Sequence, residues 1–352
     1  MSMYNKLIFL GYFLFVLLVA NNMACKKADP HYLPVLVTVE ITQITSTTAV
    51  SGGFITEHGS SKVKSRGVCW SVKPNPTIED SKTIDFLGIG DFLSNMSGLL
   101  PRFTYYVRAY ATNESGTAYG NELVIKTKDP DVNITSCPDT PIVEDIDGNI
   151  YTTVQIGEQC WMVQNLKTSK YNDGTPILNA SGYHDWISLT EPAFCWYEAS
   201  INYFNTYGAL YNWYAVEQGK LCPEGWFVPT NEDFYILTNF IKSQQEYQCD
   251  ENPHWIAKSL ASREYWEVST YQCSVGADLS NNNSTGFSGL PSGTRCPISG
   301  ISFSIGYYGF WWSSSIHSLN KASSFGLHYK LSYFGGGSLD KGEGLSVRCL
   351  KK

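Results

Sequence analysis

Residues 222–242, CPEGWFVPTNEDFYILTNFIK, decide how the C-terminal part of this 352-residue chain is organised. Thr230 and Asp233 have the spacing of a capping box, in which each side chain satisfies a backbone N–H group at the start of a helix. Three apolar side chains then recur at the spacing of a single helical face: Phe234, Leu237 and Ile241. The stretch therefore predicts a helix over about residues 231–242.

The helix lies within a larger region, residues 137–352, whose start reads as a hairpin. Asp147-Gly148 stands between two strand-like segments, which is a strong signal for a tight turn. Asp145, Asp147 and Asn149 could also suggest a calcium loop, but the spacing and the distant glutamate of an EF-hand are missing. We predict a hairpin here, and no metal site.

The preceding region, residues 35–128, reads as short strands separated by turns. Apolar and polar residues alternate with period two in several runs, listed here by range: 35–40, 49–55, 66–71, 105–111 and 122–127. Roughly seven such strands in this length fit a β-sandwich. Residues 129–136 are mostly polar and include Pro130, which disfavours regular structure, and we expect them to form a linker.

The first 24 residues resemble a bacterial lipoprotein signal peptide. Lys6 precedes an unbroken apolar run at 7–20, which is short for a membrane-spanning helix. Ala24-Cys25 follows, as in a lipobox, although Asn22 replaces the usual apolar residue. We expect Cys25 to carry lipid that anchors the protein to a membrane, with residues 25–34 as a polar tether. The alternative is an ordinary signal peptide, with Cys25 as a disulfide partner.

Eight further cysteines fall in the C-terminal region and suggest disulfides in an exported protein. Eight cysteines allow 105 pairings, so spacing alone does not fix them. Chain proximity suggests Cys137–Cys160 and Cys249–Cys273, Cys222–Cys349 would tie the middle of the region to its end, and Cys195–Cys296 is left by elimination. Cys69, alone in the sandwich region, is expected to be a buried free thiol. No CxxC or Cys/His cluster has zinc spacing, so no metal or other cofactor is predicted.

Two sets of residues resemble known families. Residues 99–105, LLPRFTY, resemble the fibronectin type III corner at which a tyrosine hydroxyl bonds back to the main chain. Residues 106–120, with 66–71, are similar to fibronectin-type modules of Bacteroidota surface proteins, where the module is generally a spacer.

The second resemblance covers almost the whole C-terminal region. Seven segments are similar in order and spacing to the Fibrobacter succinogenes major paralogous domain family: 145–149, 154–166, 207–213, 222–230, 286–295, 310–315 and 345–349. Residues 225–234 also resemble the formylglycine-generating-enzyme branch of the C-type lectin fold, and 345–348 resemble its closing strand. The resemblance implies an α+β, loop-rich, C-type-lectin-like domain with few helices. The paired active-site cysteines of that enzyme branch match no motif here.

Composition and motifs exclude several functions. The net charge is −7 and the basic residues form no stripe, which argues against nucleic-acid binding. There is no G-x-S-x-G, no H-E-x-x-H and no phosphate-binding loop, so we do not expect an enzyme. A distant carboxylate pair of a glycoside hydrolase would leave no motif, which keeps a cryptic hydrolase as a third alternative.

Residues 301–340 are rich in Tyr, Ser, Gly, Phe and His, a composition typical of binding surfaces. Trp311 and Trp312 belong to a family motif, so we expect them in the core. The predicted ligand contacts lie outside that motif: Tyr307, Tyr308, His317, His328, Tyr329 and Tyr333. The sequence thus favours an adhesin-like lipoprotein of the outer membrane surface that binds an extracellular glycan or protein. A structural component of an envelope assembly is the main alternative.

Overall fold

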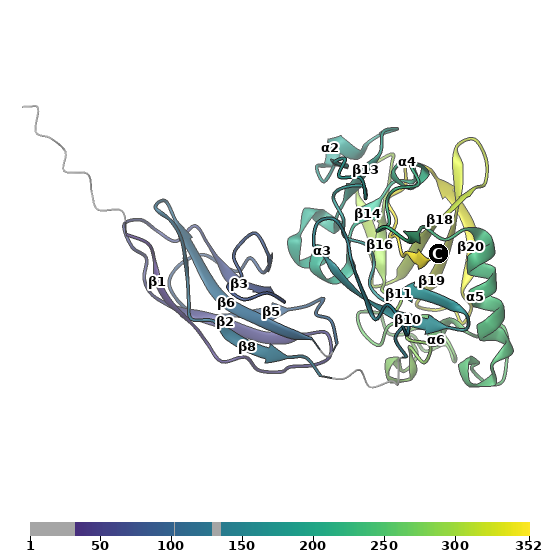
Figure 1. The fold of residues 1–352 in the computed structure, drawn as a ribbon, viewed down its shortest axis with the longest axis horizontal. Helices are drawn as coiled ribbons and strands as arrows, with labels where there is room; N and C mark the ends of the chain where they lie inside the picture. Colours follow the sequence, from purple (N-terminus) through teal and green to yellow (C-terminus); the bar gives the residue numbers. More distant parts are fainter. Residues whose placement is uncertain (1–31, 102, 129–134) are drawn as a thin grey trace, which may run out of the picture.

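The computed structural model describes residues 32–101, 103–128 and 135–352 (Figure 1). The expected signal peptide (1–24), the expected lipid site Cys25, most of the tether and linker residues 129–134 lie outside the described residues. Within the described ranges, no helix has both the length and the apolar character needed to cross a membrane. Two folded units follow each other along the chain, and we call them the sandwich unit (32–128) and the C-terminal unit (135–352).

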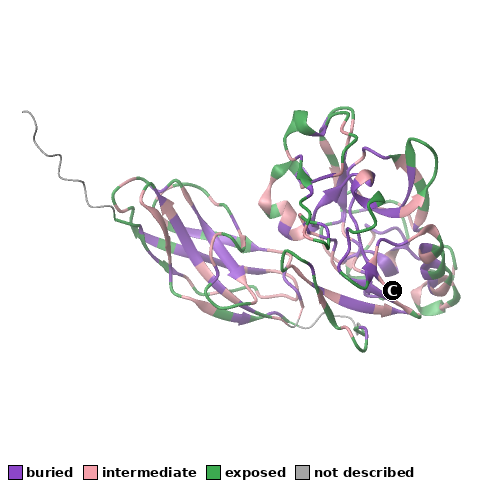
Figure 2. Cartoon of the chain, turned by 45° about the horizontal axis from the view of Figure 1, so that its top comes forward, coloured by how far each residue is buried: buried purple, intermediate pink, exposed green. Residues whose placement is uncertain are grey.

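The sandwich unit is built from antiparallel strands in two sheets. One sheet has the order β1 (Val35–Thr38), β2 (Ala49–Glu57), β5 (Gly90–Met96). The other has the order β4 (Ser81–Lys82), β3 (Ser65–Ser71), β6 (Thr104–Asn113), β7 (Gly116–Tyr119), and β8 (Leu123–Lys126) also pairs with β6. The alternation seen in the sequence places one face of each sheet inward, and Figure 2 shows these inward residues as buried.

The predicted tyrosine corner is present in the sandwich unit. The Leu100 N–H donates to the Tyr105 hydroxyl at 2.8 Å, and both residues are buried. Burial raises the pKa of Tyr105, so the hydroxyl stays protonated. Cys69 is a buried free thiol on β3, as expected, and burial raises its pKa to about 12.

The C-terminal unit contains several small sheets joined by long loops and a few helices. The largest has the order β15 (Trp226–Phe227), β21 (Leu350–Lys351), β11 (Gln159–Met162), β10 (Ile150–Ile156), β9 (Ile142–Glu144). The others are β12 (Leu178–Asn179), β13 (Ala193–Cys195), β14 (Leu210–Tyr211); β16 (Ser292–Arg295) with β17 (Ser302–Ile305); and β18 (Tyr308–Ile316), β19 (Lys321–His328), β20 (Gly335–Asp340). The helices are α2 (Tyr183–Trp186), α3 (Ile201–Tyr207), α4 (Trp213–Glu217), α5 (Asn231–Ser243) and α6 (Ala257–Leu260).

Helix α5 agrees with its prediction from the sequence. Its capping box is complete, because the Thr230 N–H donates to Asp233 Oδ2 at 2.8 Å and the Asp233 N–H donates to Thr230 Oγ1 at 3.3 Å. Its apolar face is buried as predicted, through Phe234, Leu237 and Ile241. The family resemblance places the closing strand at residues 345–348. In the structure this stretch has only isolated bridges, at Leu345 and Ser346, and the last paired strand is β21.

Strand β18 separates two hydrophobic cores of the C-terminal unit. Trp311 and Trp312 are adjacent and completely buried, as expected, and they enter different cores. Successive residues of a strand point to opposite faces, so a single strand forms a wall shared by both cores. Strand β11 does the same, with Trp161 in one core and Met162 in the other.

A buried amide ties these two walls to the end of the chain. Asn165 Oδ1 accepts from Trp311 Nε1 and from Arg348 Nη2, each at 2.8 Å. Its Nδ2 donates to Tyr207 O at 2.9 Å and to Ser346 Oγ at 3.2 Å. All four hydrogen-bonding positions of this side chain are therefore used, and the amide joins its own segment to three distant ones.

Replacing Asn165 with Ala should destabilise the C-terminal unit strongly. The change leaves Trp311 Nε1 without its acceptor and removes one acceptor from the fully buried Arg348 guanidinium. Orphaned buried donors cost about 1–3 kcal/mol each, and charged ones more, so we expect a loss of about 3 kcal/mol or more in the free energy of unfolding.

Urea unfolding followed by tryptophan fluorescence measures this loss, since every tryptophan except Trp70 lies in the C-terminal unit. Asn239→Ala, at an exposed position of α5, is the matched control and should change stability by less than about 0.5 kcal/mol. Equal urea midpoints for the two variants would contradict the structural role of Asn165.

Candidate functional site

Four of the six predicted ligand contacts meet at the open end of the β18–β19 hairpin. Tyr308 pairs with His328 across the two strands, and their rings are 4.2 Å apart between centroids. His328 is 4.9 Å from Tyr329, and Tyr329 is 5.1 Å from Tyr307. We call these four residues the aromatic cluster. Its rings form a continuous, partly exposed surface; Tyr307 is 43% exposed.

The other two predicted contacts lie in different places. Tyr333 is 53% exposed in the loop between β19 and β20, next to Gly335 at the same end of the sheet. His317 lies at the opposite end of β18, where its N–H donates to Lys321 O across the hairpin turn. The structure does not bring His317 together with the other predicted contacts, because the length of β18 lies between it and Tyr308.

The aromatic cluster has a distinct local chemistry. The Lys330 ammonium lies 5.1 Å from the Tyr329 ring centroid, a cation–π distance. Partial burial and the charge of Lys330 lower the pKa of His328, which favours the neutral imidazole at pH 7. Phe310 stacks on Tyr308 at 5.3 Å and covers Gly326, where a Cβ would lie 2.4 Å from the phenyl ring. The cluster can therefore offer flat apolar faces together with hydroxyl and imidazole hydrogen bonds.

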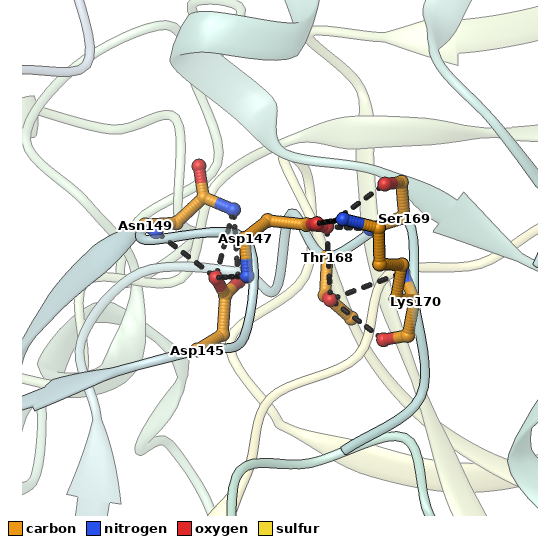
Figure 3. A network of polar contacts seen from close by, with 6 residues as sticks. All are labelled: Asp145, Asp147, Asn149, Thr168, Ser169 and Lys170. Atoms are coloured by element: carbon orange, nitrogen blue, oxygen red, sulfur yellow. Dashed lines mark hydrogen bonds and ion pairs between the residues drawn. The ribbon is translucent and has the colours of Figure 1, made fainter. Parts of the chain in front are cut away.

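The turn between β9 and β10 is held by its own carboxylates (Figure 3). Asp145 Oδ1 accepts from the N–H groups of Asp147 and Asn149 at 3.0 and 2.9 Å, and Asp145 Oδ2 accepts from the Tyr151 hydroxyl at 2.6 Å. Asp147 Oδ2 accepts from the Ser169 N–H at 2.6 Å, and its Oδ1 is 3.0 Å from Lys170 Nζ.

These contacts give the two carboxylates different electrostatics. Burial raises the pKa of Asp145, although its hydrogen bonds act against that rise. Partial burial also acts to raise the pKa of Asp147, but Ser169 and Lys170 outweigh it and lower that pKa. Because protein donors already occupy these oxygens, a cation would have to displace them. The geometry is that of a structural turn.

Three disulfides link cysteines of the C-terminal unit: Cys137–Cys160, Cys222–Cys349 and Cys249–Cys273. All three pairings agree with the expectations from the sequence. The Cys249 and Cys273 sulfurs lie near Asp250, and within the described ranges this is the one Cys/His/Asp/Glu group compact enough for a metal. Its sulfurs are in a disulfide and cannot act as thiolate ligands.

The fourth expected disulfide, Cys195–Cys296, is not formed, and this expectation was wrong. Cys195 is completely buried on β13 among Ala180, Trp186 and Leu210, whereas Cys296 is partly exposed just after β16. Burial raises the pKa of Cys195 to about 12, although the nearby Arg295 charge acts against the rise. Elimination failed here because an even count of cysteines does not require every thiol to pair.

A cavity of about 320 Å³ lies between the two units and had no counterpart in the sequence predictions. Its walls are largely apolar and come from both units: Leu99, Pro101 and Phe103 on one side, and Ile142, Val163 and Leu290 on the other. Three side-chain hydrogen bonds cross the interface beside it: Ser97 Oγ with Thr206 Oγ1 at 2.6 Å, Thr47 Oγ1 to Glu264 Oε2 at 2.9 Å, and Asn205 Nδ2 to Lys82 O at 3.0 Å. The interface was missed because residues from separate units share no local pattern.

Lys167 brings a charge into this cavity. Its Nζ donates to Asn205 O at 2.8 Å, and burial lowers its pKa to about 8, although Asp145 acts against that shift. Near pH 8 the amine thus exists in both protonation states. The cavity can accommodate a small, mainly apolar group beside one weakly basic nitrogen.

Cysteine accessibility gives a direct test of the thiol assignment. We expect iodoacetamide to modify Cys296 in the native protein and to leave Cys69 and Cys195 unmodified until the protein is denatured, because the last two are buried. Partial burial acts to raise the pKa of Cys296, but hydrogen bonds from Ser299 outweigh it and lower that pKa, which favours the reactive thiolate. Peptide mapping by mass spectrometry reports each site, and a Cys195–Cys296 cross-linked peptide would contradict the assignment.

Gly98 tests the interface between the units. A Cβ at Gly98 would lie 1.9 Å from Asn205 O, so Gly98→Ala should force the units apart and increase the radius of gyration in small-angle X-ray scattering. Gly90→Ala is the matched control, because Gly90 also has a positive φ (+89°, against +68° at Gly98) but has open space around its Cβ position. Identical scattering from both variants and the wild type would contradict a packed interface.

Solved structures are similar to part of the chain. One is the sensor domain of the anti-sigma factor RsgI4 from Pseudobacteroides cellulosolvens, with 15% identity, a TM-score of 0.23, and coverage of 28% of this chain and 98% of that one. The third fibronectin III domain of human KIAA0343 protein gives 16% identity, a TM-score of 0.24, and coverage of 32% and 98%. The sandwich unit is fibronectin type III-like in its strand pairing.

No curated protein is significantly similar to the chain. The model of the Fibrobacter succinogenes major domain matches residues 154–351, which is more than half of the sequence. This match covers α5 with its capping box, both tryptophan walls and the closing strand β21. The chain therefore belongs to the Fibrobacter succinogenes major domain family.

Proposed function

We propose that this protein is a lipid-anchored component of the cell envelope that binds an extracellular ligand, a glycan or a protein, through its C-terminal unit. The observation that carries the proposal is the aromatic cluster, where four partly exposed rings meet at one end of a rigid hairpin. Tyrosine and histidine offer both apolar faces and hydrogen bonds, which suits the apolar faces and hydroxyls of sugars as well as protein side chains.

The way the aromatic cluster is held by the strands beneath it favours a binding surface over a chance group of exposed rings. Tyr308 and His328 are fixed by strand pairing between β18 and β19, directly beyond the buried Trp311. Preorganised side chains lose little conformational entropy when a ligand binds. The rings of the aromatic cluster are thus attached to a paired hairpin that is anchored in the core by Trp311.

The envelope location is proposed from sequence and disulfide content. The apolar segment at residues 7–20 followed by Ala24-Cys25 supports export and lipidation at Cys25, with the outer membrane as the anchoring surface. Three disulfides in the C-terminal unit support an oxidising compartment. For a protein in this location we propose an adhesin-like role, as in a Bacteroidota-type surface protein.

A C-type-lectin-like arrangement of the C-terminal unit is part of the same proposal. The pairing of the terminal strand β21 with β11, near the start of the unit, supports it, as does the capped helix α5 beside that sheet. In such an arrangement the segment carrying β18 to β20 forms the ligand-binding surface. The catalytic activity of the enzyme branch is not carried over.

A binding screen of the purified, oxidised full chain on glycan and protein arrays tests the function. Tyr308→Ala and Tyr307→Ala should each weaken a hit by about tenfold or more, as for anchor residues at interfaces. His317→Ala is the matched control and should leave affinity unchanged, because His317 lies at the other end of the hairpin.

Binding should be equal with calcium and with chelator, since the Asp145 and Asp147 oxygens are already held by protein donors. A hit that His317→Ala weakens as much as Tyr308→Ala would place the site elsewhere. The absence of any hit, with stable envelope proteins co-purifying instead, would favour a structural role in an envelope assembly.

A further inference from the structure

The loop between β4 and β5 of the sandwich unit exposes an unusual amount of apolar surface. Residues 83–90 read TIDFLGIG, and the four large apolar side chains in this stretch are exposed: Ile84 by 54%, Phe86 by 89%, Leu87 by 68% and Ile89 by 53%. Single exposed apolar residues are common on proteins. Four within six positions form a contiguous patch that calls for a partner.

The backbone of this loop is fixed, so the exposure is built into the fold. The Asp85 N–H donates to Arg66 O at 2.9 Å. The Arg66 guanidinium in turn donates from Nη1 to Gly88 O at 3.0 Å and to Ile89 O at 3.2 Å. With the main chain held against β3, the side chains of Phe86 and Leu87 cannot turn inward to the sandwich core.

The strand register places the loop at the end of the sandwich where the chain enters. Gly90 at the start of β5 pairs with Ile55 of β2, and Glu57, two residues further along β2, pairs with Val35 at the start of β1. The interface with the C-terminal unit lies towards the opposite end, at Thr47, Ser97 and Lys82. Figure 1 shows the start of β1 at the left, away from the C-terminal unit.

Chain length brings this end close to the expected anchor. Tyr32 is seven positions after Cys25, and an extended chain over seven positions spans at most about 25 Å. If Cys25 is lipidated, the loop end of the sandwich must stay near the lipid surface. A patch of Phe, Leu and Ile side chains has the composition that partitions into the boundary between headgroups and acyl chains.

The charged residues at this end of the sandwich do not provide an electrostatic alternative to apolar insertion into a membrane. Lys62 and Lys64 are exposed there, but so are Glu57, Asp91 and Glu114, and Lys64 is paired with Glu114 at 3.2 Å. Attraction of these sandwich residues to anionic headgroups is therefore weak. Contact with a membrane at this end would depend on apolar insertion and would be insensitive to salt.

We propose that the loop at residues 84–89 inserts into the lipid surface to which Cys25 anchors the protein. This inference rests on the proposed lipid anchor and adds a second contact to it. Two contacts at one end of the sandwich fix the orientation of the molecule, with the C-terminal unit and its aromatic cluster directed away from the membrane. The sandwich unit then acts as an oriented stalk.

Quenching by brominated lipids tests the insertion. Phe86→Trp is introduced into the full lipidated chain, which is reconstituted into phosphatidylethanolamine–phosphatidylglycerol vesicles. We expect the added fluorescence, relative to wild type, to be blue-shifted and quenched by the brominated lipid. Leu319→Trp is the matched control, because Leu319 is 88% exposed on the C-terminal unit, and its added fluorescence should not be quenched. Equal behaviour of the two variants would overturn the inference.

A second measurement separates the loop from the anchor. Vesicle flotation of the Cys25→Ser chain should show weak, salt-insensitive binding that Phe86→Ser/Leu87→Ser reduces by about tenfold or more, while Leu319→Ser has no effect. Intact mass reports acylation of the wild type. If the wild type is acylated, and the loop variants of the Cys25→Ser chain float as well as the Cys25→Ser chain itself, the insertion is refuted and the anchor stands. An unacylated protein whose Phe86→Trp variant is still quenched refutes the anchor and supports the insertion.

Discussion

The C-terminal unit depends on one buried amide. Asn165 follows β11 and accepts hydrogen bonds from Trp311 on β18 and from Arg348 just before β21, so it holds together the two walls that divide the cores. Arg348 is fully buried. Its charge is stabilised by hydrogen bonds to neutral oxygens and by the rings of Phe287 and Trp311, whose centroids are 4.3 and 5.3 Å away. Burial lowers the pKa of Arg348 to about 9, because a charged guanidinium group loses the stabilisation of surrounding water. An asparagine is suited to this position because it offers acceptor and donor groups on one planar head.

Local sequence patterns were sufficient to predict the features that depend on residues close together in the chain. The capping box at Thr230 and Asp233, the apolar face of α5 and the turn at Asp147-Gly148 each involve residues a few positions apart. The tyrosine corner at Tyr105 is equally local. The three correct disulfides were partly local too, since two of them join cysteines 23 and 24 positions apart.

Features that depend on three-dimensional proximity were not accessible in the same way. His317 and His328 look alike in the sequence, and only the length of β18 separates them. Cys195 is enclosed by its own core cluster, which an even count of cysteines cannot reveal. The cavity between the units needs Leu99 and Leu290 in its walls, although 190 positions lie between them, and no periodicity in the sequence reports such an arrangement.

The position of β21 has a consequence for biogenesis. This strand lies inside its sheet, between β15 and β11, although it is the last strand of the C-terminal unit in chain order. Cys349 and Arg348, directly before it, supply a disulfide and the buried guanidinium. In a protein exported as we propose, a polypeptide that crosses a membrane from its N-terminus onward exposes these residues after the rest of the C-terminal unit. The sandwich unit can fold while translocation is still in progress, but the C-terminal unit must wait, incomplete, until β21 has emerged. A truncation just before Arg348 would therefore remove the centre of a sheet, and quality-control proteases would meet an unfolded domain in place of a slightly shortened one.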